Sequence, residues 1–221
     1  ITADQINNGS SDVCSGVADI SLNITDFTCV NVGANTVTLS VTDGCGNTST
    51  CTAMVTVQDN VAPVITCPDN IYIHLDPGAC DATVAWNPAT ATDACGDPVV
   101  TQTGGPVSGT TFDRNTTATV SYQAEDGNGN ISTCSFIIQI FEFVPLSNDI
   151  TCNSLVNISL DENCSAIVGA DQILEGNNYG CYDDYIVTFV ETGLPVILDG
   201  SHVGNTYEVM VVGPAGVPCW G

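Results

Sequence analysis

The twelve cysteines of this 221-residue chain recur at matching intervals, and this recurrence limits its possible folds more than any other feature. No two of them form a C-x-x-C pair, and no cysteine–histidine cluster has the spacing of a zinc site. An even number of cysteines without such motifs predicts a disulfide framework formed in an oxidising compartment. Two sets of four share nearly the same three intervals in turn: Cys67, Cys80, Cys95 and Cys134, then Cys152, Cys164, Cys181 and Cys219.

Two longer motifs repeat with the cysteines. TDGCGNTSTC at 42–51 returns as EDGNGNISTC at 125–134, and SDVCSG at 11–16 parallels TDACGD at 92–97. A period of roughly 85 residues predicts separate domains in series, each with its own core. We expect three repeats: the C-terminal part of a first repeat at 1–59, a complete one at 60–143, and a third that lacks its last strand at 144–221.

Apolar side chains stand at every second position along much of the chain. Residues 36–42, 71–75, 118–123 and 134–140 show this alternation, with mostly polar residues between. A period of two predicts antiparallel strands with one buried and one wet face, and Gly-, Asp- and Asn-rich turns separate them. No segment shows a sustained helical period. We therefore predict an all-β chain of tandem immunoglobulin-like β-sandwich domains stapled by disulfides.

The chain is strongly acidic. It has one basic residue, Arg114, no lysine and 25 acidic residues, for a formal net charge of −24. Such a surface repels nucleic acid and anionic membranes and attracts divalent cations. No apolar run is long enough to span a membrane. Without a signal peptide and with abrupt ends, the sequence is expected to be a fragment of a longer secreted polypeptide.

The middle of the chain carries a family resemblance. The motifs P-x-I-T-C-P, A-T-D-x-C-G, Y-x-A-x-D-x-x-G-N and T-C-S-F fall in order within residues 62–140. This segment resembles the hyalin repeat (HYR) domain, an immunoglobulin-like sandwich. The first repeat looks like a related one, and the third like a further immunoglobulin-like repeat of very large secreted bacterial surface proteins. The third lacks the D-x-x-G-N turn and departs most from the pattern.

The resemblance implies an extracellular, cell-surface role as a stalk or filament in cell adhesion. Its implied partners are other repeats of the same chain and surface glycans or proteins. Two alternatives stay open. One is a segment of a homo-oligomeric surface appendage, a fibre or hook. The other is a carbohydrate-binding module, for which Tyr179, Tyr182 and Tyr185 form the candidate patch, although a loop packed against its own domain also explains these tyrosines.

The disulfide pairing rests partly on topology and partly on the resemblance. The first and last strands of such a sandwich run parallel, which brings Cys67 to Cys134. Family members with only two cysteines resemble this chain at those positions, which leaves Cys80 with Cys95, although a strand separates these two. Cys51 is expected to bond a cysteine upstream of the segment, or else Cys45 across the hairpin. By analogy, the remaining expected pairs are Cys152–Cys219, Cys164–Cys181 and Cys14–Cys29.

Calcium is the candidate cofactor. DGNGN at 126–130 looks like an EF-hand loop, but Ile131 stands where that loop needs Gly and Ile137 where it needs Glu. A sandwich places this turn at the same end as the linker VQDN at 57–60. Oxygen ligands there suit calcium at a domain junction, although turn chemistry alone explains the same residues. The candidate ligands are Asp59, Asn60, Asp93, Asp126 and Asn128, with Glu125 and Asp97 nearby.

An enzyme is not expected. The two histidines, His74 and His202, stand without a Ser or Cys nucleophile at a recognisable spacing. The acidic pair Asp183–Asp184 cannot act as a glycosidase dyad if it lies in a strand, because adjacent strand residues point to opposite faces.

Overall fold

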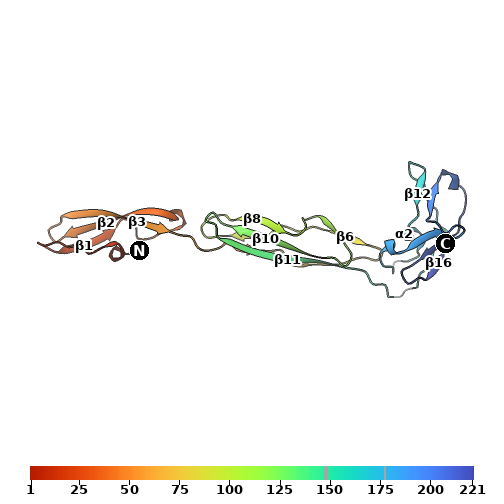
Figure 1. Ribbon diagram of the computed structural model, residues 1–221, viewed down its shortest axis with the longest axis horizontal. Coiled ribbons are helices and arrows are strands. Elements are labelled where there is room, and N and C mark those ends of the chain that lie inside the picture. The colour runs from red at the N-terminus through yellow and green to blue at the C-terminus, as the bar shows by residue number, and fades with distance from the viewer. Residues whose placement is uncertain (147–148, 177) are drawn as a thin grey trace. The chain divides into compact units, whose positions relative to one another are not determined.

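Figure 1 shows the computed structural model of the protein, which describes residues 1–146, 149–176 and 178–221. Its α-helices there are two single turns, α1 (Ala3–Ile6) and α2 (Ala170–Ile173), and strands dominate the rest. The prediction of an all-β, disulfide-bonded chain is confirmed. We call residues 1–59, 60–143 and 144–221 the first, middle and last repeats. The chain divides into two compact units: Ile1–Cys67, Ala89–Thr103 and Ser121–Cys134, then Pro68–Pro88, Gly104–Val120 and Ser135–Gly221.

The first repeat forms one antiparallel sheet in the order β1-β2-β3 (Figure 1). β1 (Val17–Leu22) pairs with β2 (Gly33–Asp43), which turns tightly into β3 (Thr48–Val57), and η1 (Cys29–Asn31) lies between β1 and β2. Val37 and Leu39 of β2 are buried, with 0% and 1% of their surface exposed. Because side chains two residues apart share a face of a strand, the core of the first repeat lies on one face of β2.

The middle repeat contains eight strands in its described residues. Its larger sheet has the order β5-β11-β10-β8, with β5 parallel to β11. Two antiparallel pairs, β4–β7 and β6–β9, complete the repeat. The strands are β4 (Val64–Thr66), β5 (Ile71–His74), β6 (Asp81–Val84), β7 (Thr90–Thr92), β8 (Val99–Gly104), β9 (Thr110–Asp113), β10 (Thr117–Glu125) and β11 (Ile131–Phe141).

The core of the middle repeat comes from the alternation along its two longest strands. β10 buries every second side chain from Val120 to Ala124, and β11 does so from Phe136 to Ile140. Val84 of β6 and Phe112 of β9 are buried as well, and they supply apolar surface from the smaller pairs. Burial of each Val, Ile or Phe among them contributes about 1.5–3 kcal/mol, so the period of two seen in the sequence defines the core.

The last repeat has shorter elements. β12 (Ser165–Ile167) pairs with β14 (Ile197–Asp199), and a second sheet has the order β13-β15-β16. The sequence predicts that this repeat lacks its last strand, but the structure has a short strand there, β16, paired antiparallel to β15. The other elements are η2 (Tyr182–Asp184), β13 (Ile186–Phe189), η3 (Gly200–His202), β15 (Val209–Val212) and β16 (Pro218–Trp220).

The three strands of the first repeat correspond to three of the four strands in the larger sheet of the middle repeat. The interval that carries Asp43 onto Asp126 also carries β1 onto β8, β2 onto β10 and β3 onto β11, to within a residue or so at their ends, and the order of the strands is the same. In the middle repeat β5 lies beside β11. No strand lies in the matching position beside β3 in the described part of the first repeat.

Candidate functional site

The repeated D-x-x-G-N motif is a hairpin turn closed by its own side chains. Between β10 and β11, Asp126 Oδ1 accepts hydrogen bonds from the backbone N–H groups of Asn128 and Asn130, each at 2.8 Å. Asp126 Oδ2 accepts a third from Asn130 Nδ2 at 2.8 Å. Asp43 and Asn47 close the turn between β2 and β3 in the same way. These bonds favour the ionised carboxylates and lower the pKa of Asp126 and Asp43, with the Asn side chains as the largest cause. The motif is a structural turn.

The turn in the middle repeat also holds the linker that enters this repeat. Asn128 Nδ2 donates to Asp59 Oδ2 at 3.1 Å, and Asn130 Nδ2 donates to the backbone oxygen of Asp59 at 3.0 Å. The other carboxylate oxygen of Asp59 accepts from the N–H of Val61 at 3.1 Å. We call the end of a repeat that meets the preceding repeat its leading end, which in the middle repeat carries this turn. The opposite end is its trailing end, which in the middle repeat is where β10 begins and β11 finishes.

A disulfide crosses the junction at this leading end. Cys29 of the first repeat is bonded to Cys95 of the middle repeat, with 4.9 Å between their Cα atoms. Asp93 Oδ1 accepts from the N–H of Cys95 at 2.8 Å and shapes the loop. The predicted pair Cys14–Cys29 is therefore wrong, because the partner of Cys29 lies in the next repeat.

Two of the predicted calcium ligands, Asp59 and Asp93, lie close together. Carboxylate oxygens of Asp59 and Asp93 lie within 4.8 Å of each other and of Cys95 Sγ. That sulfur belongs to a disulfide and offers no thiolate. The carboxylate of Asp126 is engaged in its own turn, and Asn60 is exposed. Since calcium takes 6–8 oxygen ligands, two facing carboxylates need further groups, and the calcium site stays a prediction.

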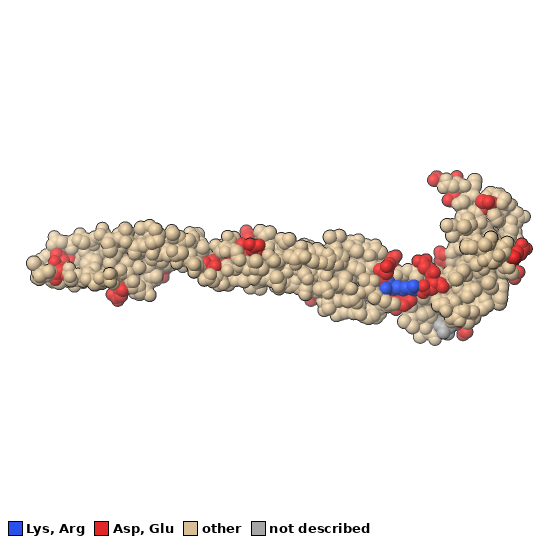
Figure 2. All heavy atoms as spheres, viewed as in Figure 1, with Lys and Arg blue, Asp and Glu red and all other residues tan. Residues whose placement is uncertain are grey.

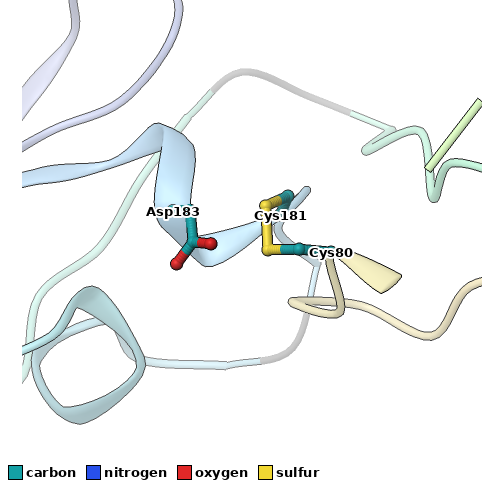
Figure 3. A group of neighbouring side chains, drawn as sticks. All are labelled: Cys80, Cys181 and Asp183. Carbon is teal, nitrogen blue, oxygen red and sulfur yellow. A yellow bond between two sulfur atoms is a disulfide. The ribbon is translucent and has the colours of Figure 1, made fainter. Parts of the chain in front are cut away.

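A second disulfide crosses the junction between the middle and last repeats. Figure 3 shows Cys80 bonded to Cys181, with Asp183 beside the sulfurs; the Cα atoms are 4.7 Å apart. These three groups also lie within 4.8 Å of one another, but the bonded sulfurs leave no thiolate for a metal. The predicted pairs Cys80–Cys95 and Cys164–Cys181 are both wrong. These predictions assumed that the cysteines of one repeat bond each other. In the structure Cys80 and Cys95 belong to different compact units.

Two disulfides within repeats agree with the sequence analysis. Cys67, just after β4, is bonded to Cys134 of β11, and Cys152 is bonded to Cys219 of β16. The two bonds span 67 residues each, with Cα atoms 5.9 and 5.6 Å apart. Four cysteines of the described chain carry exposed free thiols: Cys14, Cys45, Cys51 and Cys164.

Backbone contacts reinforce the Cys80–Cys181 junction. The N–H of Gly78 donates to the oxygen of Tyr179 at 3.0 Å, and the N–H of Tyr182 donates to the oxygen of Gly78 at 3.1 Å. The ring of Tyr182 packs so closely that a Cβ added to Gly78 would lie 2.1 Å from it. Gly78 also has a φ of +82°, which side chains other than that of glycine rarely allow. Only glycine fits this position.

The one basic side chain of the protein lies at the same junction. Arg114 forms a bidentate ion pair with Asp184, and its Nη1 also donates to Glu142 at 3.1 Å. Asn115 Nδ2 donates to the second oxygen of Glu142 at 2.9 Å. Figure 2 shows this single blue side chain between red acidic ones. The guanidinium lowers the pKa of Asp184, because its hydrogen bonds favour the ionised carboxylate.

The candidate sugar patch is engaged in packing. Tyr179 is buried, and its hydroxyl donates to the backbone oxygen of Glu175 at 2.6 Å. Tyr182 packs on Gly78, and Tyr185 lies edge-on to Tyr179 with ring centroids 5.9 Å apart. The three tyrosines thus pack in the loop of the last repeat that contacts the middle repeat at Gly78.

The two histidines also have structural contacts. His74 stacks on Phe141 with ring centroids 4.6 Å apart, and His202 Nδ1 lies 2.8 Å from Asp199 in a turn. The pKa of Asp199 falls to about 2, chiefly through its hydrogen bonds with Ser201.

Comparison with known proteins shows what the central segment of the chain is similar to. Residues 58–140 match the family model of the HYR domain. The chain is 31% identical over 130 residues to hyalin of Strongylocentrotus purpuratus, a match that covers 57% of this chain and 11% of hyalin. These matches support a HYR domain in the middle repeat.

Two solved structures show a weaker likeness. Extracellular cadherin domains 1–4 of protocadherin gamma B7 align at 15% identity with a TM-score of 0.30, over 93% of this chain and 66% of that one. The human desmocollin-1 ectodomain aligns at 12% identity with a TM-score of 0.28, over 87% and 43%. No helix among the described residues is long and apolar enough to cross a membrane.

Replacing Gly78 by alanine is expected to open the junction with the last repeat. The new Cβ meets the Tyr182 ring at a forbidden distance and strains a positive φ, so we expect a loss of about 2–3 kcal/mol. Faster reduction of Cys80–Cys181, followed by thiol labelling and peptide mass mapping, measures the effect. Gly96→Ala is the matched control, because nothing lies within 4 Å of its added Cβ. Equal reduction rates in both variants would contradict the packing described.

The ion pair of Arg114 gives a second prediction. Arg114→Gln should lower the stability at pH 7 by about 1–2 kcal/mol, and Arg114→Lys by less, because lysine keeps the charge and loses the bidentate geometry. The pKa of Asp184 is lowered in the folded state, so the contribution of the pair is complete above the unfolded value of about 4 and is lost as the pH falls through the folded value. Urea midpoints from pH 7 to pH 2.5 should show wild type and Arg114→Gln converging only below about pH 4. A difference that instead disappears on raising the pH would contradict this assignment.

Proposed function

We propose that this chain is a load-bearing repeat segment of a large extracellular surface protein, acting as a stalk or filament in cell adhesion. The observation that carries the proposal is that a disulfide closes each of the two repeat junctions, in addition to the peptide chain. Bonds across a junction add little to the folding of a single repeat. They matter where force along the chain would pull neighbouring repeats apart.

The spans of the disulfides overlap along the sequence. The bond from Cys29 reaches past Cys67 and Cys80, and the bonds from these two cysteines begin before it ends. The bond from Cys152 begins within the span of Cys80–Cys181. A pull on the two ends therefore meets a covalent path of roughly 75 residues, against 221 in the whole chain. A second route through Cys67–Cys134 is nearly as short, so the loss of Cys80–Cys181 leaves the length of the path almost unchanged.

The composition supports an extracellular setting. Disulfides form and persist where the medium is oxidising. The net charge of −24 keeps such a chain hydrated and disfavours collapse onto nucleic acid or anionic lipid. The match to the HYR domain and the similarity to hyalin favour an adhesive role of this kind over catalysis. The bacterial origin and the filament remain part of the proposal.

Two other roles are weaker. A carbohydrate-binding module requires exposed aromatic rings, and the tyrosines predicted for it are engaged in packing and hydrogen bonds. A subunit of an assembled appendage would share the same repeats. Native mass measurement separates it from a stalk, because an appendage subunit would form stable multimers without covalent bonds.

Force spectroscopy on the chain, pulled from its two ends, tests the load-bearing role. In oxidising buffer the fully extended length should be roughly 270 Å, and after complete reduction roughly 790 Å, at about 3.6 Å per residue. A control variant with serine at the four free cysteines should behave like the oxidised wild type. An oxidised chain that extends to its full length would contradict the overlapping bridges.

Calcium at the leading junction is a separate proposal. Asp59 and Asp93 face each other there, and an ion between them would relieve their repulsion. Melting temperatures should then rise with millimolar calcium relative to EDTA, and the rise should disappear in Asp93→Asn. Asp97→Asn, in the same loop, serves as the control. Unchanged melting in calcium and in EDTA would remove the ion from the account.

A further inference from the structure

The two junction disulfides follow one rule. A cysteine at the trailing end of one repeat bonds a cysteine at the leading end of the next. Cys80 directly precedes β6, and the interval that carries Asp43 onto Asp126 carries Cys29 onto Phe112 of β9, which pairs with β6. Cys80 thus lies at the β6–β9 pair of the middle repeat, and Cys29, in η1 just before β2, lies at the position of the first repeat that corresponds to β9. Their partners, Cys95 and Cys181, occupy the third position in the matching cysteine series of their repeats.

The free thiol of Cys14 occupies a leading-end position. SDVCSG around Cys14 parallels TDACGD around Cys95, and each loop precedes a strand of the same length, β1 or β8. The local geometry is also the same. Asp12 Oδ1 accepts from the N–H of Cys14 at 3.0 Å, as Asp93 Oδ1 does from the N–H of Cys95 at 2.8 Å. The N–H of Gly44, in the hairpin turn of the first repeat, donates to the backbone oxygen of Gly16 at 3.1 Å and holds this loop at the leading end.

The free thiol of Cys164 occupies a trailing-end position. Cys164 directly precedes β12 as Cys80 precedes β6. The first pair of the two-stranded sheet that follows is Ser165 with Asp199, and in the middle repeat it is Asp81 with Asp113. A turn precedes each of these strands, with Cys164 at its last position in one and Cys80 just after it in the other. The N–H of Cys164 donates to the backbone oxygen of Asp161 at 3.0 Å, and the N–H of Ala79, just before Cys80, donates to that of Asp76 at 3.1 Å.

We propose that Cys14 and Cys164 are the open ends of this junction series, and that each forms a disulfide with the complementary cysteine of an adjacent repeat of the same type. Cys14 takes a trailing-end cysteine, and Cys164 takes a leading-end one. Two thiols become one disulfide, and a small-molecule or protein disulfide accepts the two electrons and two protons and leaves as two thiols. The adjacent repeat belongs either to a longer polypeptide or to a second copy of this chain.

The other two free thiols do not share this role. Cys51 of β3 corresponds to Cys134 of β11, whose partner lies in the same repeat, and Cys45 corresponds to Asn128, which is no cysteine. The proposal rests on the junction geometry and is independent of the adhesive role, so the failure of either leaves the other standing.

The chain carries both complementary ends, so copies of it can test the rule. In a Cys45→Ser, Cys51→Ser background, one protein also carries Cys164→Ser and keeps Cys14, and a second also carries Cys14→Ser and keeps Cys164. The two are mixed in equal amounts with reduced and oxidised glutathione at about 1 mM protein, near the effective concentration of linked domains. Non-reducing electrophoresis and peptide mass mapping then count the dimers, and circular dichroism checks that both proteins keep their strand content.

We expect the mixed Cys14–Cys164 dimer to exceed each homodimer by about tenfold, whereas random pairing gives a twofold excess. Random ratios, or glutathione adducts without dimers, would overturn the proposal. Dilution to about 1 µM identifies the source of the adjacent repeat. A mixed dimer that persists indicates a second copy, and one that forms only at millimolar concentration indicates a tethered repeat of a longer chain.

Discussion

The overlap of the disulfide spans is the constraint on which the rest of the structure depends. Each bond closes a loop of 66 to 101 residues, and each span begins before the preceding one ends. Loops of this length stabilise a folded state by about 4–5 kcal/mol each when they act alone. Overlapping loops share the same chain, so their effects do not add. Their common consequence is that each repeat is covalently linked to the next one across the junction, in addition to the peptide chain.

The sequence predicts the interior of a repeat well. The alternation along 118–123 and 134–140 marked the strands whose side chains are buried, because burial depends on the local period of two. The parallel course of the first and last strands, together with the family resemblance, predicted Cys67–Cys134, and both cysteines belong to one repeat. The meeting of Asp59 with Asp93 also followed from sandwich topology. The direction of the Asn128 amide, which donates to Asp59, did not, because it depends on side-chain rotamers that no pattern encodes.

The junction disulfides could not be assigned from the spacing of the cysteines, but the predicted pairs were inconsistent with the repeat. Cys14 and Cys95 occupy equivalent loops, but the predicted pairs gave Cys14 a partner later in the chain and Cys95 a partner earlier in it. One fold cannot satisfy both within a repeat if equivalent loops have equivalent neighbours. Pairing across the junction removes the conflict, because the partner of a leading-end cysteine then comes from another repeat.

The acidic charge of the chain explains why each junction has ion pairs or hydrogen bonds besides its disulfide. With 25 acidic residues, any close approach of two repeats brings carboxylates together, and at about 4 Å two like charges near a protein surface repel by about 4 kcal/mol. At the trailing end of the middle repeat Arg114 lies between Glu142 and Asp184 and turns this repulsion into attraction. At its leading end the amides of Asn128 and Asn130 donate to Asp59, which satisfies one carboxylate without a cation. A chain with a single basic residue thus has it where two carboxylates from successive repeats converge, and it uses neutral donors at the other junction.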